Sequence, residues 1–558
     1  MIRFRRNILQ KFFRRLSPCH RSCFIAAIWG TTLLTCPIAP AAARSESALN
    51  LLLHAAASAE SHRIPISYAT TRITKPKTRT GLVDYLAAEN AVLSRGVTLK
   101  NNAAVKFYEV LGAVFCGNEA LWGAAYPPNA SRTRWQRAVL SAWHIPRQAV
   151  SQGEIITFAT FCRAGVPGLP SKAFPPPAKS IARARKFLRH PWAPTPPDEL
   201  AAQWLTANHP ALVRIREACN LPHFYIPLVI PSLIVDGRTV RTKMLWAVTL
   251  DYLPAIRGMG NVLNADAAID FGRGDIRDCL NDLIALHRLA RLFSDQGNMM
   301  CQRTAWSMEN KACRADLEVV KSGDMSPNQL SSYLIAARHL SAFSPLSSAL
   351  DIDDRWGQLS FLQICASDPK IRSAMIRVLG GFLKRYQFEA WPRQYFIGAA
   401  KEFNKLDDQV VAAFRANPWG ARMTAIRNAA ARRDQFGASK LVYKQTVAMS
   451  CIKPWRWATL QARSRDRRRL DVLTIAIAEY RDDHSKFPDR LARLAPKYLP
   501  TIPRDPFTGK PFRYTASPTG CTISSPGEFS PQLFPGSQLP QGRPIIVHLS
   551  LPPGKFSQ

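Results

Sequence analysis

Short motifs that carry a known chemistry are missing from this 558-residue chain. There is no Cys-x-x-Cys, His-Glu-x-x-His, Gly-x-Ser-x-Gly or glycine-rich phosphate loop, so redox-thiol, zinc-protease, α/β-hydrolase and P-loop chemistry have no local support. Ser450 and Lys453 are spaced as Ser-x-x-Lys, but Pro454 disfavours the helical turn that a serine–lysine dyad needs. We therefore assign no catalytic residue, cofactor or metal ligand, and the motifs lean against an enzyme.

Acidic residues are scarce, with 39 Asp and Glu against 75 Lys and Arg and a net charge of +36. Residues 411–470 hold 14 basic and two acidic residues, and residues 171–190 hold six basic residues and no acid. Such a field attracts anionic lipid, cell-wall polymer or nucleic acid, although a solvated helix face has the same composition. The candidate contact residues for an anion or a membrane are Trp455, Arg456, Trp457, Arg463, Arg465, Arg467, Arg468 and Arg469.

Long apolar runs are also rare, and the informative one lies near the N-terminus. Residues 1–22 carry seven basic residues and no acid, residues 23–36 are apolar, and Ala41-Ala42-Ala43 fits a cleavage site. We interpret residues 1–43 as a signal peptide; the alternative is an uncleaved inner-membrane anchor in residues 23–43. In both cases the bulk of the chain is expected to be exported, to the periplasm or beside the inner membrane, which disfavours nucleic acid as a partner.

Nine cysteines remain beyond residue 43, so an odd one is left unpaired within the chain. Most of them stand among apolar residues and are expected to be buried thiols. A local bridge between Cys301 and Cys313 is the alternative that the spacing raises.

Hydrophobic residues make up 47% and charged residues 20% of the chain, a balance typical of a folded protein. The apolar periodicity predicts a mainly α fold. Asn102 is expected to cap a helix with an apolar stripe from Ala104 to Val114, and Asp275 a helix that forms an αα-hairpin with the one before it. Ser326 is expected to cap another helix. The remaining predicted helices cover residues 259–271, 276–293, 368–386, 399–416, 421–436 and 467–482.

Changes in composition divide the chain into four parts. Residues 1–43 are the signal peptide or anchor, and residues 44–198 are a helical region that ends in a proline-rich linker. Residues 199–465 form a helical-hairpin, repeat-like body. Residues 466–558 open with a helix and then become rich in prolines and turns, which indicates a small α+β module.

The C-terminal module contains an ordered set of residues: Tyr480, Phe487-Pro488, Leu491, Leu494, Asp505-Pro506-Phe507, Pro511 and Tyr514. In this order and spacing the module resembles the globular end of the major pseudopilin of type II secretion. The pseudopilin's N-terminal assembly helix has no counterpart, because Gly30 is followed by TTLLT without the glutamate of that family. The chain is therefore not predicted to be a pilus subunit. With its helical body it resembles a group of uncharacterised exported or membrane-attached bacterial proteins, which implies location and architecture only.

The module also has a physical interpretation. Six residues are expected to cover the apolar face of the helix over 467–482: Phe487, Leu491, Leu494, Tyr498, Phe507 and Tyr514. Asp505 is expected to be a turn residue, because too few carboxylates surround it in the sequence for a calcium site.

Two further groups contain residues that can form a site. Asp351, Asp353 and Asp354 have the composition of a divalent-cation site, but we interpret them as caps of a helix that begins near Arg355. His287 lies on an apolar helix face and is expected to be a hydrogen-bonded core residue. The sequence thus predicts a non-catalytic scaffold or interaction protein of the bacterial envelope. The alternatives are an envelope hydrolase with a site assembled from dispersed residues, and a peripheral membrane protein bound through a basic face.

Overall fold

A computed structural model describes residues 63–116, 137, 139–143, 154–164, 175–192, 198–230, 233–235, 238–240, 243–379, 388–416, 419–437, 454–525 and 544–550. The contacts divide the chain into two units, residues 1–60 with 233–240, and residues 61–232 with 241–558. In the first unit, the described part is an antiparallel hairpin of β1 (Leu233–Val235) and β2 (Arg238–Val240). The predicted signal peptide or anchor lies outside the described residues. None of the described helices combines the length and apolarity needed to cross a membrane.

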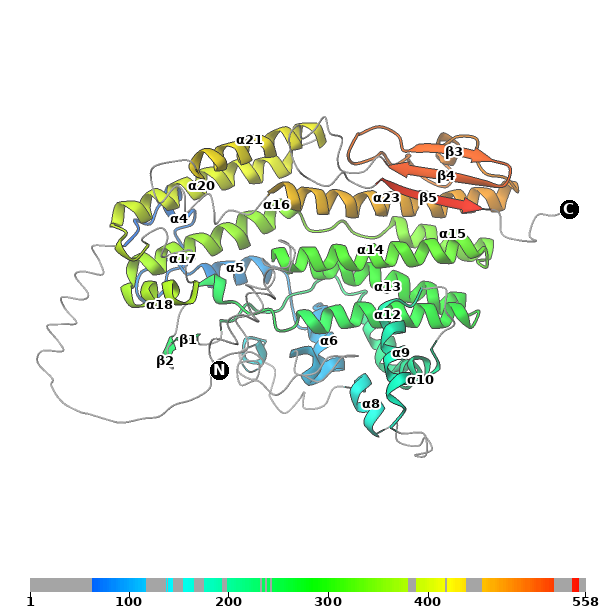
Figure 1. Ribbon diagram of the computed structural model, residues 1–558, viewed down its shortest axis with the longest axis horizontal. Helices are drawn as coiled ribbons and strands as arrows, with labels where there is room; N and C mark the ends of the chain where they lie inside the picture. The colour runs from blue at the N-terminus through cyan, green and yellow to red at the C-terminus, as the bar shows by residue number, and fades with distance from the viewer. Residues whose placement is uncertain are drawn as a thin grey trace, which may run out of the picture. The chain divides into compact units, whose positions relative to one another are not determined.

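The second unit is mainly helical (Figure 1), as the sequence predicts. Its first part contains short helices connected by irregular chain. Their bounds are α4 Tyr68–Thr71, α5 Tyr85–Leu93, α6 Ala103–Leu111, η2 Gly112–Cys116, α8 Phe158–Ala164, α9 Ala178–Arg189, α10 Glu199–Ala207, α11 His209–Ala218 and η5 Leu245–Ala247.

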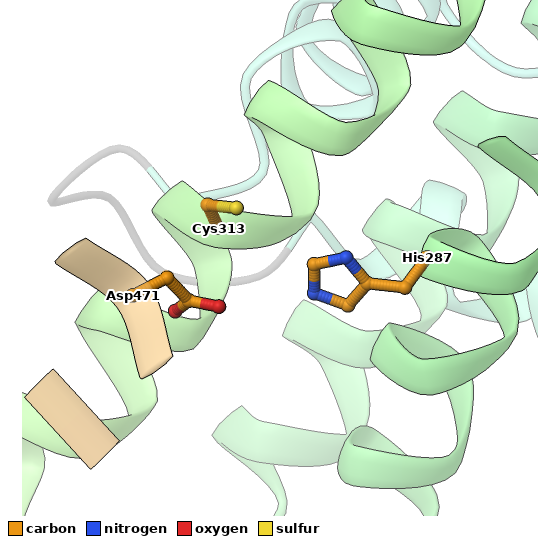
Figure 2. Close-up of side chains that lie close together, drawn as sticks. All are labelled: His287, Cys313 and Asp471. Atoms are coloured by element: carbon orange, nitrogen blue, oxygen red, sulfur yellow. The ribbon is translucent and has the colours of Figure 1, made fainter. Parts of the chain in front are cut away.

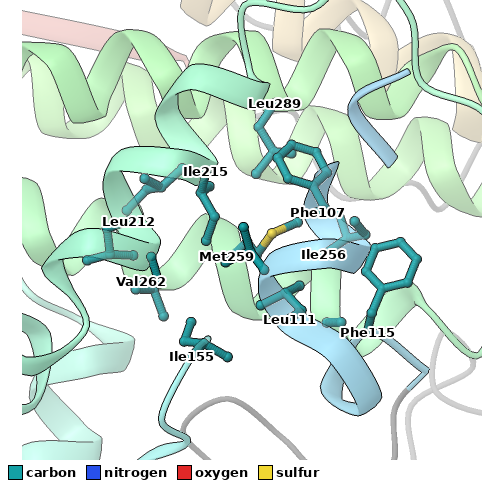
Figure 3. Close-up of a cluster of buried hydrophobic side chains, with 14 of the residues drawn as sticks. Phe107, Leu111, Phe115, Ile155, Leu212, Ile215, Ile256, Met259, Val262 and Leu289 are labelled. Carbon is teal, nitrogen blue, oxygen red and sulfur yellow. The ribbon is translucent and has the colours of Figure 1, made fainter. Parts of the chain in front are cut away.

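Helix α6 anchors the first hydrophobic core. The Asn102 side chain accepts a hydrogen bond from the Ala104 N–H at 3.1 Å, which confirms the predicted cap. The predicted stripe is buried, and Figure 3 shows Phe107 and Leu111 directed into a cluster of apolar side chains from other helices. Met259 reaches the same cluster, so this core joins the N-terminal region to the predicted body.

Three long helices form the centre of the unit: α12 (Leu253–Gly272), α13 (Ile276–Ser294) and α14 (Met299–Ser322). They pack against one another in sequence order, and α12 and α13 make the predicted αα-hairpin around Gly274. Asp275 accepts a hydrogen bond from the Asp278 N–H at 3.5 Å, as expected of its cap. Gly297 separates α13 from α14 with a φ of +73°, a conformation that glycine adopts without strain.

The remaining helices largely follow the predicted pattern. Helix α15 begins with a complete capping box, in which Ser326 and Gln329 each bond the other's backbone N–H. Residues 380–386 of one predicted helix lie outside the described residues. The bounds are α15 Pro327–Arg338, α16 Leu346–Ala349, α17 Arg355–Ser367, α18 Pro369–Leu379, η7 Phe388–Ala390, α20 Arg393–Arg415, α21 Trp419–Gly437 and α23 Pro454–His484.

The predicted capping role of the aspartates before Arg355 is wrong. Helix α17 begins at Arg355 as expected, but Asp354 makes no capping hydrogen bond there, because α16 continues through a π-helical turn (η6, Leu350–Asp354) directly into α17. Asp353 instead contacts the start of α14, where its two oxygens accept hydrogen bonds from Asn298 Nδ2 (2.9 Å) and the Met299 N–H (3.0 Å). Asp351 forms an ion pair with Arg355 at 3.1 Å.

Helix α23 is longer than predicted and passes through the expected domain boundary at 465/466. Its C-terminal half is covered by η8 (Leu491–Leu494) and by an antiparallel sheet of β3 (Arg513–Ser517), β4 (Gly520–Ser525) and β5 (Ile545–Ser550) (Figure 1). The small α+β module is thus present. Five of the six residues expected to cover the helix belong to this second core or pack against it: Phe487, Leu491, Leu494, Tyr498 and Tyr514.

Phe507 is the exception to that expectation. Its ring packs edge-on against Trp419 at the start of α21, with 5.3 Å between the ring centroids. Asp505, two residues earlier, accepts hydrogen bonds from the N–H groups of Phe507 (2.7 Å) and Thr508 (3.0 Å), which confirms its turn role.

Seven cysteines are free and buried, as expected for most of them: Cys162, Cys219, Cys279, Cys301, Cys313, Cys365 and Cys521. The alternative disulfide between Cys301 and Cys313 does not form, because both residues lie on α14, three helical turns apart.

Candidate functional site: a basic face over a buried charge cluster

The aromatic end of the candidate contact set packs onto the protein. Trp455, Arg456 and Trp457 open α23, and all three are half-buried. The Arg456 guanidinium lies 5.7 Å from the centroid of the Trp455 ring, and Trp457 packs edge-on against Trp306 of α14 at 6.2 Å. These tryptophans therefore fix the start of α23 against α14, in addition to any outside contact they make.

One side of α23 faces α21. Arg465 is exposed, and Arg469 donates a hydrogen bond to the Arg504 carbonyl oxygen at 2.6 Å. Arg422 of α21 donates to Gln461 Oε1 at 3.4 Å. Partial burial, with the positive charges of Arg422 and Arg469, lowers the pKa of Arg465 to about 10. The buried carboxyl groups of Asp466 and Asp505 lie close enough to offset part of this positive charge.

The other outward side of α23 meets α14 and carries a denser group of cations. Arg467 lies near Arg463 and Arg314, and Lys311 lies near Arg314 and Arg257, so α12, α14 and α23 all contribute. Burial and the charges of Arg314 and Arg463 lower the pKa of Arg467. Burial and the charges of Arg257 and Arg314 lower the pKa of Lys311. We call these five side chains the basic face.

Two members of the basic face make no ion pair among the described residues. Neither Arg314 nor Arg467 makes an ion pair or a side-chain hydrogen bond there, whereas Lys311 donates to Asn261 Oδ1 and Arg257 to Thr304 Oγ1. Asp466 offsets part of the charge of Arg467, but the cations outnumber it, and an excess of like charge raises the local potential and favours an anion. The arrangement can therefore hold a phosphate or carboxylate group between α14 and α23.

Two of the five side chains of the basic face were predicted from the sequence. Arg463 and Arg467 were predicted, but Arg257, Lys311 and Arg314 lie far from them along the chain. The spacing of Lys311 and Arg314 by three residues, which places them on one helix face, was the available local signal. That α14 lies beside α23 is set by tertiary packing, which one sequence does not display.

Arg468 is directed inward, although its neighbours in the sequence are not. Its side chain is 14% exposed, its Nη1 lies 2.7 Å from Asp471 Oδ2, and its Nε lies 3.7 Å from Glu309 Oε1. Arg468 also donates to the Ala337 carbonyl oxygen of α15. Its guanidinium is thus used in internal contacts, unlike that of Arg467.

Arg468 belongs to a buried charge cluster, defined by His287, Arg291, Glu309, Asp316, Arg468 and Asp471. His287 Nδ1 lies 2.7 Å from Glu309 Oε2, and His287 Nε2 lies 2.8 Å from Asp316 Oδ2. Arg291 donates to both oxygens of Glu309, at 2.6 and 2.9 Å. The cluster joins α13, α14 and α23, and it confirms His287 as a hydrogen-bonded core residue.

The cluster's electrostatics follow from these pairs. Burial alone would lower the pKa of His287, but Glu309 and Asp316 raise it overall, which favours the imidazolium form. Burial opposes ionisation of Glu309, yet His287 and Arg291 hold its pKa far below the usual range. Burial and the neighbouring Asp316 raise the pKa of Asp471 well above the usual range.

Two other predicted features are Asp353 and the Ser450–Lys453 pair. Burial raises the pKa of Asp353 to about 6, although its hydrogen bonds from Met299 and Asn298 oppose this. Ser450 and Lys453 lie outside the described residues, so the serine–lysine spacing stays a sequence observation.

Comparison with known proteins adds no relative. No protein-family model matches the chain, and neither a curated protein nor a solved structure matches it. The resemblance of the C-terminal module to pseudopilins therefore stays a prediction from the residues that carry it.

Proposed function

We propose that this chain is an exported scaffold or interaction protein of the bacterial envelope that docks onto an anionic partner through its basic face. The observation that carries the proposal is the convergence of five cations from three helices, two of which make no ion pair or side-chain hydrogen bond among the described residues. An anionic lipid headgroup and a phosphate-bearing cell-wall polymer share the chemistry that this face would recognise.

The way in which the body and the C-terminal module are joined supports a scaffold role. Helix α23 contributes Arg467 to the basic face, Arg468 and Asp471 to the buried charge cluster, and Leu473 to the core beneath the sheet. A partner bound at the basic face would therefore be held at a fixed place relative to the module. We further infer that the module keeps a pseudopilin-like arrangement, a long helix covered by a short helical turn and an antiparallel sheet.

Peripheral membrane binding is the second candidate, and Trp455 favours it. This ring is half-exposed beside Arg456 at the same helix end, a combination that suits a lipid–water interface. Trp457 argues the other way, because it packs against Trp306.

The test is binding of the full chain to three probes: vesicles containing phosphatidylglycerol, vesicles of phosphatidylcholine alone, and soluble polyphosphate. The variant Arg314→Ala/Arg467→Ala removes the two unpaired cations. At about 1 kcal/mol per basic residue near an anionic surface, the loss of affinity should be roughly 30-fold. Arg277→Ala/Lys370→Ala is the matched control, since it removes two exposed cations elsewhere and should leave binding unchanged.

The pattern across probes separates the two candidates. Binding to anionic vesicles with weak binding to polyphosphate favours the membrane, and the reverse favours a polymer partner. Wild-type affinity of the double variant for every probe would contradict the basic face as the docking site. Recovery of a chain that begins near Ala42 or Arg44 from the soluble periplasmic fraction would establish export and cleavage, whereas an intact Met1 in the membrane fraction would establish the anchor.

A further inference from the structure

We propose that one end of the buried charge cluster binds a zinc-class transition-metal ion, with His287 Nε2, Cys313 Sγ and the Asp471 carboxylate as ligands and Asp316 as the fourth. The proposal is independent of the basic face and of export. It rests on the geometry of three helices that meet at this point.

The three principal ligand atoms are already close together. One ligand atom from each of His287, Cys313 and Asp471 lies within 4.8 Å of the other two. Figure 2 shows the edge of the imidazole ring facing both the thiol and the carboxyl group. Ligands about 2.0–2.3 Å from a tetrahedral zinc ion lie roughly 3.3–3.8 Å from one another, so a contraction of about 1 Å would complete the site.

Two of the proposed ligand atoms lie close to groups that do not satisfy them. Asp471 Oδ1 is buried and faces the carboxyl group of Asp316. The Cys313 thiol is buried and makes no hydrogen bond within the described residues. Two buried carboxyl groups that face each other repel unless a proton or a cation lies between them, and a metal ion is one such cation.

The surroundings provide the support that a metal-binding histidine requires. His287 Nδ1 is bonded to Glu309, and two donors of Arg291 hold Glu309 in place. This carboxylate–histidine pair leaves Nε2 directed at the proposed site, as in metal centres where a carboxylate orients the ligating imidazole. Tyr333 donates to the second oxygen of Asp316, so the orientation of the fourth ligand is also fixed.

The donor set selects the class of metal. A thiolate and an imidazole favour zinc and related ions over calcium or magnesium, which take oxygen ligands. All four proposed ligands are buried, and Asp316, whose Oδ2 lies 2.8 Å from His287 Nε2, would turn toward the metal to complete a closed coordination sphere. On binding, the metal would displace a proton from each of His287, Cys313 and Asp471, and these protons pass to solvent. Such an ion would fasten α23, and with it the C-terminal module, to α13 and α14.

Cobalt(II) is the probe that tests the site, because its spectrum reports both the ligand type and the geometry. The full chain is stripped with EDTA and titrated with cobalt alone. We expect one cobalt per chain, a thiolate-to-cobalt charge-transfer band, and the intense visible bands of tetrahedral cobalt, all removed by added zinc. Cys313→Ser should abolish the charge-transfer band. Cys301→Ser changes another buried thiol of the same helix and should keep it.

A second variant keeps the test decisive if Cys313→Ser fails to fold. Tyr333→Phe removes the hydroxyl that orients Asp316 but no proposed ligand and no charge, and it should weaken zinc affinity about 10-fold or more while the thiolate band persists. The absence of a thiolate band in the wild-type chain, or its survival in folded Cys313→Ser, would overturn the proposal. In that case the cluster is an ion-pair network alone.

Discussion

Glu309 offers the sharpest test of the buried charge cluster as a structural element. Its side chain is fully buried and contacts three cationic groups: His287 at 2.7 Å, Arg291 at 2.6 and 2.9 Å, and Arg468 at 3.7 Å. Glu309→Gln keeps the shape but removes the negative charge. The new amide N–H groups would also face Arg291 or His287, where a donor meets a donor.

The expected loss in the free energy of unfolding is about 3–5 kcal/mol, the range for removing one partner of a buried ion pair and leaving the other charge uncompensated. The measurement is urea denaturation followed by circular dichroism, with EDTA present so that metal binding does not contribute. Glu318→Gln is the matched control on the same helix. Its carboxylate is 46% exposed and lies 3.6 Å from Lys321, so that change should stay within about 0.5 kcal/mol.

The comparison of the two variants decides the matter. If Glu309→Gln loses less than about 1 kcal/mol, the cations around it are not held as the structure describes, and the cluster does not fasten α13, α14 and α23. If both variants lose several kcal/mol, the loss does not depend on burial of the carboxylate, which also contradicts the prediction.

Two further predictions concern other parts of the fold. Burial raises the pKa of Asp466 to about 7, although a hydrogen bond from Ser525 opposes this, so the folded chain holds this proton more tightly than the unfolded chain. The free energy of unfolding should therefore fall as pH rises from about 4 to 7. Over that window the stability of Asp466→Asn relative to the wild type should increase by up to about 4 kcal/mol, measured by urea denaturation at several pH values. Parallel pH profiles of the two proteins would contradict this. Gly297→Ala should lose about 1–2 kcal/mol, because its φ is +73° and its Cβ would lie 2.7 Å from Leu93 Cδ2. Thermal melts measure this loss, with Gly420→Ala as the control: a Cβ there meets nothing within 4 Å, so the change should be neutral or stabilising. An equal loss of stability in both variants would contradict the steric explanation.

Local signals predicted local structure well. The caps at Asn102, Asp275 and Ser326 were predicted because a cap is a contact between a side chain and a backbone group two or three residues away. The same logic failed at Asp353. An aspartate before a helical pattern has the composition of a cap, but here the backbone continues through a π-helical turn, and the carboxylate serves a different helix, α14.

Long-range pairing was beyond the sequence pattern. Phe507 was expected to pack on the helix of its own module, but its ring packs against Trp419 of α21. His287 is on α13, Cys313 on α14 and Asp471 on α23, so their spacing along the chain matches no metal-binding motif. Only the packing of three helices brings their ligand atoms together.

The basic run on α23 illustrates how helical geometry divides one sequence feature among different roles. Residues spaced by three or four share a helix face, whereas adjacent residues diverge by about 100°. Arg463 and Arg467 are four apart, and Arg467 lies near Arg314 of α14. Arg465 and Arg469 are also four apart; Arg465 lies near Arg422 of α21, and Arg469 contacts the Arg504 carbonyl oxygen.

Arg468 is three residues from Asp471, the acid with which it is buried, and this spacing was visible in the sequence. Arg467 is four residues from the same Asp471, so spacing alone does not tell these two arginines apart. Charge excess alone predicts an anion-binding surface of eight residues here. The tertiary packing of α23 decides which arginine turns inward: Arg468 forms the ion pair with Asp471, whereas Arg467 makes none among the described residues.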